Sequence, residues 1–410
     1  MMRKALFTFC RLLLGAVFVF SGFTKGVDPL GTMYKLEDYF SAFHLNVLAP
    51  YALVLSIVLN GAEFLMGIAL LTGVWMRFTA WMALLFMTFF TVLTFVLALY
   101  NPVSDCGCFG DAVVLTNWQT FFKNLVIIVP AIVVFIHRRS FESSLTPAGN
   151  LMVVLITAMA FLYFSLYCYR HLPLIDFRPY KTGTYLPDQM IVPPGAPRDS
   201  FQTVLYYKKD GVIKEFTLEN IPWQDTTWKW VETKNKLIKA GYKPPIHDFT
   251  IESTQEGDIT SRVLADTGFS FLAVIPKYEK ADSAGLKKIE AVYRWCRNTE
   301  KCKFYALSAS EHEKAEAYKK RYGLTFENYI TDEIPLKTIV RSNPGLVLLK
   351  EGTVMGQWSY EDIPVLDVHT HSLYGLALNT LRKKSETTAT MTAFLLLAFL
   401  LSIVFVRYRK

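Results

Sequence analysis

Apolar residues are concentrated in six stretches of the chain, each about as long as a helix that crosses a bilayer. They are Ala5–Thr24, Pro50–Gly73, Thr79–Tyr100, Trp118–Ile136, Leu151–Tyr169 and Thr388–Val406. About 20 mainly apolar residues span the hydrocarbon core as a helix. Lys123, Asn124 and Pro130 interrupt the fourth stretch, but membrane helices tolerate proline and a lysine near one end. The pattern predicts six transmembrane helices.

Between the fifth and sixth stretches the pattern changes to alternating strands and helices. The expected elements are a hairpin around Lys209–Gly211, strand Phe269–Ile275, helix Ala284–Cys296, strand Phe304–Ser308, helix Glu311–Tyr322 and a hairpin around Lys350–Gly352. This alternation predicts an α/β sandwich that closes with an antiparallel hairpin. Prolines 193, 194 and 197 mark the stretch 187–200 as a linker.

One more helical pattern lies between the first two apolar stretches. Met33, Leu36, Phe40, Phe43 and Val47 recur at helical spacing, and polar residues take the other faces. This predicts an amphipathic helix, either on the outer membrane surface or packed on the bundle. In both cases it is a candidate cover for the outward mouth of the bundle.

Composition and charge agree with a membrane part joined to a soluble part. Of 410 residues, 52% are hydrophobic and 19% are charged. Basic residues at the helix ends fall on one side of a six-span topology: Arg3, Lys4, Arg77, Arg138, Arg139, Arg407, Arg409 and Lys410. The positive-inside rule places both termini in the cytoplasm. The net charge of +8 therefore needs no nucleic-acid partner.

The segment Asp105–Asp111 contains Cys106 and Cys108 in a short loop that faces outward in this topology. A Cys-x-Cys pair closes only a small, strained disulfide, and strained disulfides are readily reduced. The pair is therefore the candidate for catalytic redox chemistry. The alternatives are half of a soft-metal site or two unpaired thiols. Asp105 and Asp111 count against an activated thiolate, because nearby negative charge raises a thiol pKa.

A charge inside the second apolar stretch also needs an explanation. Glu63 lies near its middle, where an ionised carboxylate is costly unless it is paired. Counting about 1.5 Å per residue puts Arg11 about 6 Å inward of mid-depth, within reach of Glu63. Lys25 ends the first stretch. We expect a structural Glu63–Arg11 clamp, or else a proton relay or quinone headgroup pocket that includes Lys25.

Three further cysteines have less specific settings. Cys296 and Cys302 lie at a predicted helix end and strand start, which favours a structural disulfide over a redox relay. Cys168, at the outer end of the fifth stretch, is either a third redox thiol or a packing residue. With Cys106 and Cys108 it could also hold copper(I).

One further metal site is considered and discounted. Asp367, His369 and His371 alternate, so an extended strand would project all three from one face. Such triplets also arise by chance in solvated loops. We therefore assign no metal ligands.

Three motifs in the first third of the chain resemble a known membrane family. They are Phe20–Lys25 followed by Asp28-Pro29, the segment Glu63–Gly73, and the loop Cys106–Gly110. Over roughly residues 5–140 they resemble the DoxX/MauE family of four-helix membrane proteins, especially its MauE-like branch and the DoxX-type proteins of Bacteroidetes with an outward extension. The resemblance implies a membrane thiol–disulfide or quinone-linked role, since relatives act in thiosulfate:quinone oxidoreduction or disulfide-dependent maturation.

The outward region resembles a thioredoxin/TlpA-like domain. The similarity rests on Pro244–Phe249, Phe269–Ile275 and the Pro344 hairpin, with Pro344 in the position of the family's cis-proline. The chain departs from the family after the first core strand, where Pro276–Asp282 contains no Cys-x-x-Cys. We therefore expect no ordinary thioredoxin activity, because the attacking thiolate is absent there.

Together these features predict a membrane helical bundle with a thioredoxin-like α/β domain. The expected division is a four-helix domain at 1–140, a fifth span at 148–170, an extracytoplasmic region at 171–375 with its core at about 240–365, and a last span at 388–407. We expect a bacterial inner-membrane protein with a periplasmic domain that acts on extracytoplasmic protein thiols, with quinone as the candidate cofactor. The alternative is a non-catalytic docking or assembly factor, or a soft-metal-binding protein, for secreted proteins.

Overall fold

The structure is a computed structural model of the whole chain. It describes residues 2–139, 146–197, 200–239, 241–367 and 372–407. The chain forms two compact units, one of Met1–Thr184 with Thr250–Lys410 and one of Tyr185–Phe249. Each unit is described by itself.

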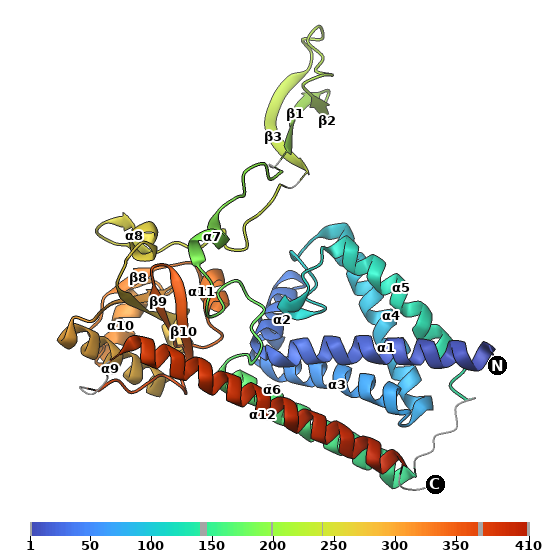
Figure 1. The fold of residues 1–410 in the computed structure, drawn as a ribbon. Helices are drawn as coiled ribbons and strands as arrows, with labels where there is room; N and C mark the ends of the chain where they lie inside the picture. Colours follow the sequence, from blue (N-terminus) through green and yellow to red (C-terminus); the bar gives the residue numbers. More distant parts are fainter. Residues whose placement is uncertain (1, 140–145, 198–199, 240, 368–371, 408–410) are drawn as a thin grey trace. The chain divides into compact units, whose positions relative to one another are not determined.

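Among the described residues, six helices are long and apolar enough to span a membrane. They are α1 Met2–Val27, α3 Ala52–Thr72, α4 Met76–Tyr100, α5 Asn117–Ile136, α6 Pro147–His171 and α12 Leu373–Arg407 (Figure 1). The six predicted spans are confirmed, and the chain is a multi-pass membrane protein. The last helix begins at Leu373, well before the predicted start at Thr388.

Glycines bring α1 and α3 into close contact. A Cβ atom added at Gly22 would lie 2.6 Å from the backbone nitrogen of Phe64, and one at Gly67 would lie 2.6 Å from that of Val19. Small residues allow such approach between membrane helices, where van der Waals packing replaces the hydrophobic effect as the driving force. These two contacts fix the antiparallel register of α1 and α3.

The helix predicted between the first two spans is present and ends earlier than its apolar pattern. Helix α2 runs from Pro29 to Ala42, with Asp28 as its N-cap, and the short η1 follows at Asn46–Tyr51. Ser56 of α3 donates a hydrogen bond of 2.7 Å to the Pro29 carbonyl. Of the two alternatives, α2 is therefore the helix packed on the bundle.

The α/β part of the first unit has a seven-stranded sheet in the order β10-β9-β6-β7-β8-β4-β5. Its elements are β4 Glu252–Ser253, β5 Gly257–Asp258, α8 Thr260–Leu264, β6 Phe269–Ile275, η3 Tyr278–Lys280, α9 Ser283–Thr299, β7 Cys302–Ser308, α10 His312–Tyr322, β8 Asn328–Ile330, α11 Glu333–Ile339, β9 Gly345–Lys350 and β10 Thr353–Ser359. Strand β6 is parallel to β7 and antiparallel to β9, which pairs with β10. This is a thioredoxin-like fold, as expected.

The core of this fold lies between the sheet and its helices. Phe271, Ala273 and Leu346 from β6 and β9 are buried against Leu286 and Ile289 of α9. Phe271 and Ala273 are two residues apart on β6, and Leu286 and Ile289 are three apart on α9, so each pair lies on one face of its element. The sheet thus fixes the end of β6 and the start of β9. The loop after β6 and the loop before β9 are the ones that contact the membrane domain.

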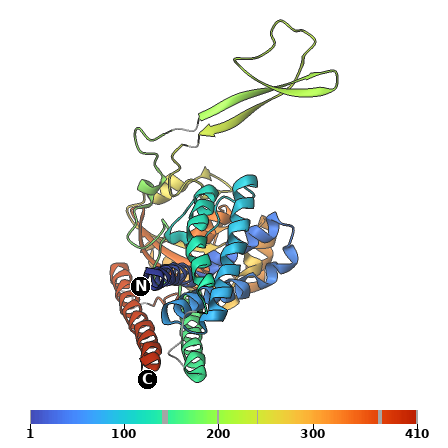
Figure 2. The same cartoon turned by 90° about the vertical axis from the view of Figure 1, so that its right-hand side faces the viewer.

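The second unit is a small sheet that the sequence pattern anticipated only in part. It contains α7 Leu186–Met190 and strands β1 Ser200–Lys209, β2 Val212–Thr217 and β3 Lys229–Lys239, in the order β2-β1-β3. Figure 2 shows these strands as a narrow ribbon. The hairpin around Lys209–Gly211 is present. Strand β3 was missed because most of its residues are charged or polar, which resembles a solvated segment.

Candidate functional site

The two loop thiols lie close together between α4 and α5. The Sγ atoms of Cys106 and Cys108 are 3.1 Å apart, and both cysteines are free. Cys106 is buried and Cys108 is half-buried. Gly107 between them has φ +66°, a left-handed conformation that glycine adopts without steric cost. The loop therefore turns tightly enough for the two sulfur atoms to meet.

Hydrogen bonds from two helices hold the backbone of this loop. The Tyr39 hydroxyl of α2 donates to the Cys106 carbonyl at 2.9 Å, and the Ser21 hydroxyl of α1 donates to the Cys108 carbonyl at 2.6 Å. After the short η2 (Gly110–Ala112), α5 begins with a capping box formed by Thr116 and Gln119. The thiols are thus carried by a loop that is fixed on both sides.

The environment makes the two thiols unequal. The hydrogen bond from the Cys106 thiol lowers the pKa of Cys108 to about 6; burial opposes this effect, while Lys123 and Lys25 add to it. The same hydrogen bond, together with burial, raises the pKa of Cys106. The directions of the two shifts make Cys108 the thiol that ionises first, while Cys106 retains its proton. A thiolate is the form that attacks disulfides and other electrophiles.

The acidic residues beside the thiols are paired with bases from other elements. Asp105 lies 2.7 Å from the ammonium of Lys35 on α2, and Asp111 lies 2.8 Å from the guanidinium of Arg341. Neither carboxylate is among the largest influences on the pKa of Cys108. Each of these carboxylates therefore has a basic partner whose charge offsets its effect on the thiols.

Beneath the loop lies a buried ion pair between α1 and α3. Glu63 pairs with Lys25, and both side chains are less than a tenth exposed. Asn60 donates a hydrogen bond of 3.2 Å to the Lys25 carbonyl. We expected Glu63 to pair with Arg11. This expectation is corrected, since within the described residues Glu63 forms its ion pair with Lys25.

The physical reason is the helix register. Phe64 packs against Gly22, so Glu63 lies near the outer end of α1. Arg11 is 14 residues before Lys25, about 21 Å along the helix axis. A count of depth within each apolar stretch cannot show how far α1 and α3 are shifted along each other. The glycine contacts between the two helices set that shift.

The thiols and the ion pair line one cavity of about 750 Å³. Phe18, Phe86, Phe90, Leu93 and Ile127 make much of its wall apolar. Arg11 and Cys168 are not among its lining residues. Ligand cavities of this size are typically apolar with a few polar groups that orient the ligand.

Lys123 contributes another positive charge to this cavity. Its ammonium lies 4.3 Å from the centroid of the Phe109 ring, next to Cys108 in the chain, and it lowers the pKa of that thiol. The sequence pattern treated Lys123 only as an interruption of an apolar stretch. No local signal distinguishes a lysine that extends to the interface from one that faces a thiol.

A second base reaches the loop from the thioredoxin-like domain. Arg341 lies between α11 and β9, and its guanidinium is 2.7 Å from Asp28 and 2.8 Å from Asp111. Burial alone would lower the pKa of Arg341, but the two carboxylates raise it above its ordinary value. Sequence analysis missed Arg341, because its partners are hundreds of residues away in the chain.

Near Arg341, the peptide bond between Asn343 and Pro344 is cis. The Asn343 carbonyl accepts a hydrogen bond of 2.9 Å from the nitrogen of Asp282, the N-cap of α9. Gly285 packs against Pro344. The residues that meet the cis-proline thus carry no thiol, in agreement with the sequence.

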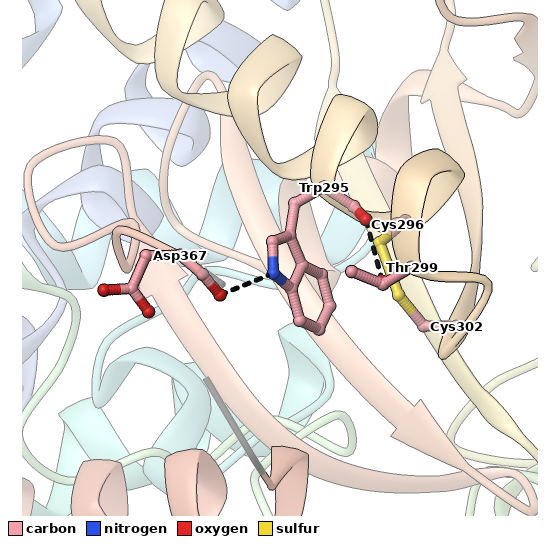
Figure 3. Close-up of a disulfide and its surroundings, with 5 residues drawn as sticks. All are labelled: Trp295, Cys296, Thr299, Cys302 and Asp367. Carbon is pink, nitrogen blue, oxygen red and sulfur yellow. Dashed lines mark hydrogen bonds between the residues drawn. A yellow bond between two sulfur atoms is a disulfide. The ribbon is translucent and has the colours of Figure 1, made fainter. Parts of the chain in front are cut away.

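The remaining cysteines lie elsewhere. Cys296 at the end of α9 and Cys302 at the start of β7 form a disulfide, beside the Trp295 indole that donates to the Asp367 carbonyl (Figure 3). Cys168 is buried in another cluster with Val27 and Phe164. The structure therefore does not bring Cys168 to the cavity as a third redox thiol.

Metal binding receives no support from the described residues. They contain no group of three or more His, Cys, Asp or Glu side chains placed to hold a metal ion. Cys168 lies in a different buried cluster from Cys106 and Cys108, so the three cysteines are not brought together as copper ligands in the described residues. His369 and His371 lie outside the described residues, so the Asp367 triplet stays untested.

Comparisons with known proteins agree with the membrane part of this description. Residues 3–137 match the family model of the methylamine utilisation protein MauE. Residues 201–240 match a domain of unknown function. No curated protein matches the chain. The first third of the chain is therefore a MauE-like membrane domain.

Two solved structures show weak likeness to this chain. A solution structure from Bacteroides thetaiotaomicron, provisionally assigned as a protein disulfide isomerase, is 16% identical and covers 33% of this chain and 86% of its own, with a TM-score of 0.24. The bacterioferritin comigratory protein of Xanthomonas campestris is 13% identical and covers 36% of this chain and 91% of its own, with a TM-score of 0.20. We draw nothing from these scores. The thioredoxin-like assignment rests on the strand order and on Pro344.

Proposed function

We propose that this MauE-like multi-pass membrane protein is a thiol–disulfide oxidoreductase whose reacting groups are Cys106 and Cys108. The observation that carries the proposal is the unequal thiol pair, with sulfur atoms 3.1 Å apart, on the wall of a largely apolar cavity. A depressed thiol pKa at a cavity wall is typical of reactive cysteines. By the positive-inside rule, the pair faces the extracytoplasmic side and acts there on protein thiols.

The exchange with a client balances in atoms and electrons. A disulfide between Cys106 and Cys108 is attacked by a client thiolate, and a mixed disulfide forms as the bond between the two loop sulfurs breaks. The second client thiol gives its proton to Cys106 and, as a thiolate, attacks the client sulfur of the mixed disulfide, which releases the client as a disulfide. The loop is left with the Cys106 thiol and the Cys108 thiolate, so the client loses two electrons and the loop gains them.

The loop must then pass two electrons to an acceptor, for which we propose a quinone. The apolar wall fits a ring with an isoprenoid tail, and Lys25 and Glu63 offer polar contacts for a headgroup. The wall also includes Phe43, Leu45 and Phe89, which are exposed and give a lipid-soluble molecule a route from the bilayer. When bound there, a quinone would supply a two-electron, two-proton acceptor: the Cys106 thiol and Cys108 thiolate would give up two electrons and one proton as they form their disulfide, and water would supply the second proton.

Trapping the thiol state in membranes tests this function. The full chain in liposomes would be reduced, exposed to decylubiquinone or to solvent alone, and alkylated at timed intervals. We expect the alkylated fraction of Cys106 and Cys108 to fall only with quinone, while Cys168 is unaffected. Substituting each loop cysteine with serine should abolish quinol formation.

If the alkylated fraction of Cys106 and Cys108 is the same with and without quinone, the proposed electron transfer is contradicted. Full biological function in the double serine variant would instead favour the alternative, a non-catalytic docking or assembly factor for secreted proteins. That alternative has one supporting observation, the lack of a thiol beside Pro344 in the thioredoxin-like domain.

A further inference from the structure

The thioredoxin-like domain contributes to the wall of the thiol cavity. Ile334, Lys337 and Thr338 of α11, with Arg341 after it, line the same cavity as Cys106 and Cys108. These residues come from the segment that leads into cis-Pro344. The domain therefore touches the membrane site through the loop that precedes its cis-proline.

Arg341 joins two separate parts of the membrane domain. Asp28 caps the N-terminus of α2, where it accepts from the Gly31 nitrogen at 2.9 Å. Asp111 follows Cys108 by three residues. One guanidinium thus holds both the helix that covers the loop and the loop itself. We call this set of interactions the Arg341 contact.

Further charges and rings surround the Arg341 contact. The ammonium of Lys337 lies 3.8 Å from Glu37 of α2 and 4.6 Å from the centroid of the Tyr34 ring, and Arg341 lies over the same ring at 5.5 Å. Lys280, at the end of η3, is 4.0 Å from Glu37. Several of these are long or exposed pairs, which stabilise little individually. The buried Arg341 side chain, only 7% exposed, is the strongest member.

The arrangement also explains how Cys106 and Cys108 are covered. Tyr39 and Lys35 of α2 are bonded to the cysteine loop at Cys106 and Asp105. Helix α2 therefore lies between the thiols and a protein in solution, and Arg341 fixes its N-terminal end. A client polypeptide is far larger than a lipid-soluble acceptor, so it needs this cover to move.

We propose that Arg341 is a positioning residue that keeps the thiol loop covered by α2, and that a client protein reaches Cys106 and Cys108 only after Arg341 releases Asp28 and Asp111. The role of this opening in admitting a client protein rests on the proposed function. The Arg341 contact itself does not depend on that function. The thioredoxin-like domain thus acts through its arginine on a site in another domain, and the absence of a thiol beside its cis-Pro344 is consistent with that role.

Alkylation with reagents of two sizes tests the proposal. The full chain in liposomes, reduced and without quinone, would be treated with N-ethylmaleimide or with a maleimide carrying a 5-kDa polyethylene glycol. Arg341→Gln removes the ion pairs, Arg341→Lys keeps one charge, and Asp111→Asn leaves the Asp28 pair intact. Arg262→Gln removes an exposed ion pair of the same domain and is the matched control.

We expect Arg341→Gln to raise the rate of Cys108 modification by the bulky reagent roughly tenfold or more, since a loss of about 1.4 kcal/mol in the closed state changes an equilibrium tenfold. The small reagent should change much less. Asp111→Asn and Arg341→Lys should give intermediate increases, and Arg262→Gln none.

Two results would overturn the proposal. One is an unchanged bulky-reagent rate in Arg341→Gln. The other is an equal rise for both reagents, which would mean that Arg341 supports the fold and does not control access. Neither result depends on electron transfer. The alkylation test of Arg341 therefore remains valid even if the quinone experiment fails.

Discussion

Replacing Cys106 with alanine should remove the lowered pKa that sets Cys108 apart from an ordinary thiol. The hydrogen bond from Cys106 is the largest cause that lowers the pKa of Cys108 to about 6, whereas an unperturbed thiol has a pKa of 9.0. Without that donor, burial opposes the remaining effect of Lys123 and Lys25. We expect the pKa of Cys108 to rise from about 6 towards 9.0.

The magnitude follows from the two forms of the thiol. At pH 7 a pKa of about 6 leaves about 90% thiolate, whereas a pKa near 9 leaves about 1%. The thiolate with the higher pKa is more nucleophilic by roughly 16- to 30-fold, since the Brønsted coefficient is about 0.4–0.5. The alkylation rate at pH 7 should therefore fall only about three- to sixfold. The pH midpoint of the reaction is the sharper measure.

The assay is iodoacetamide alkylation of the reduced chain between pH 4.5 and 10, with mass spectrometry to follow Cys108 separately from other cysteines. The wild-type rate should be present above the midpoint near pH 6 and lost as the pH falls through it. Cys106→Ala should move this midpoint to about 9. Cys106→Ser is the matched control, because its hydroxyl retains a donor and should keep the midpoint lower than in Cys106→Ala. A wild-type midpoint near 8.5, or no shift in Cys106→Ala, would refute the reasoning.

Three further predictions concern stability. Glu63→Gln should destabilise the bundle by about 3–5 kcal/mol, because Lys25 is left buried and unpaired, and a double substitution of both residues by methionine should cost less; unfolding in detergent measures both. Gly22→Ala should cost about 1–3 kcal/mol by forcing α1 away from α3, seen as a lower unfolding temperature. Replacing Cys296 and Cys302 with alanine should cost about 2 kcal/mol, as expected for a short closed loop, without changing alkylation of the loop thiols.

Each stability prediction has a control in the same chain. The exposed pair Arg382–Glu386 on α12 should be removable with little effect. Gly375→Ala places its Cβ at an ordinary 3.6 Å from Ser372 and should be tolerated. If Gly22→Ala is tolerated as well as Gly375→Ala, the close contact of α1 with α3 is contradicted. A double methionine variant less stable than Glu63→Gln would contradict the account of the ion pair.

The sequence by itself determined the parts of this protein that depend on local patterns. Six apolar stretches predicted six spanning helices because a bilayer requires each helix to satisfy its own backbone and to present an apolar surface. Strand β6 was predicted from residue 269 to residue 275, as observed, because a buried strand between helices is a short apolar run. The cis-proline position of Pro344 and the absence of a thiol after β6 could also be predicted, because each depends only on its place in the order of strands and helices along the chain.

The tertiary structure decided which charged groups meet at the candidate site. Lys25 pairs with Glu63 because the glycine contacts set the register of α1 and α3, and no local pattern encodes a register between two apolar helices. Arg341 reaches Asp28 and Asp111 across 313 and 230 residues of chain. Electrostatic interactions act through space, so the chemical character of the cysteine loop depends on groups whose proximity only folding creates.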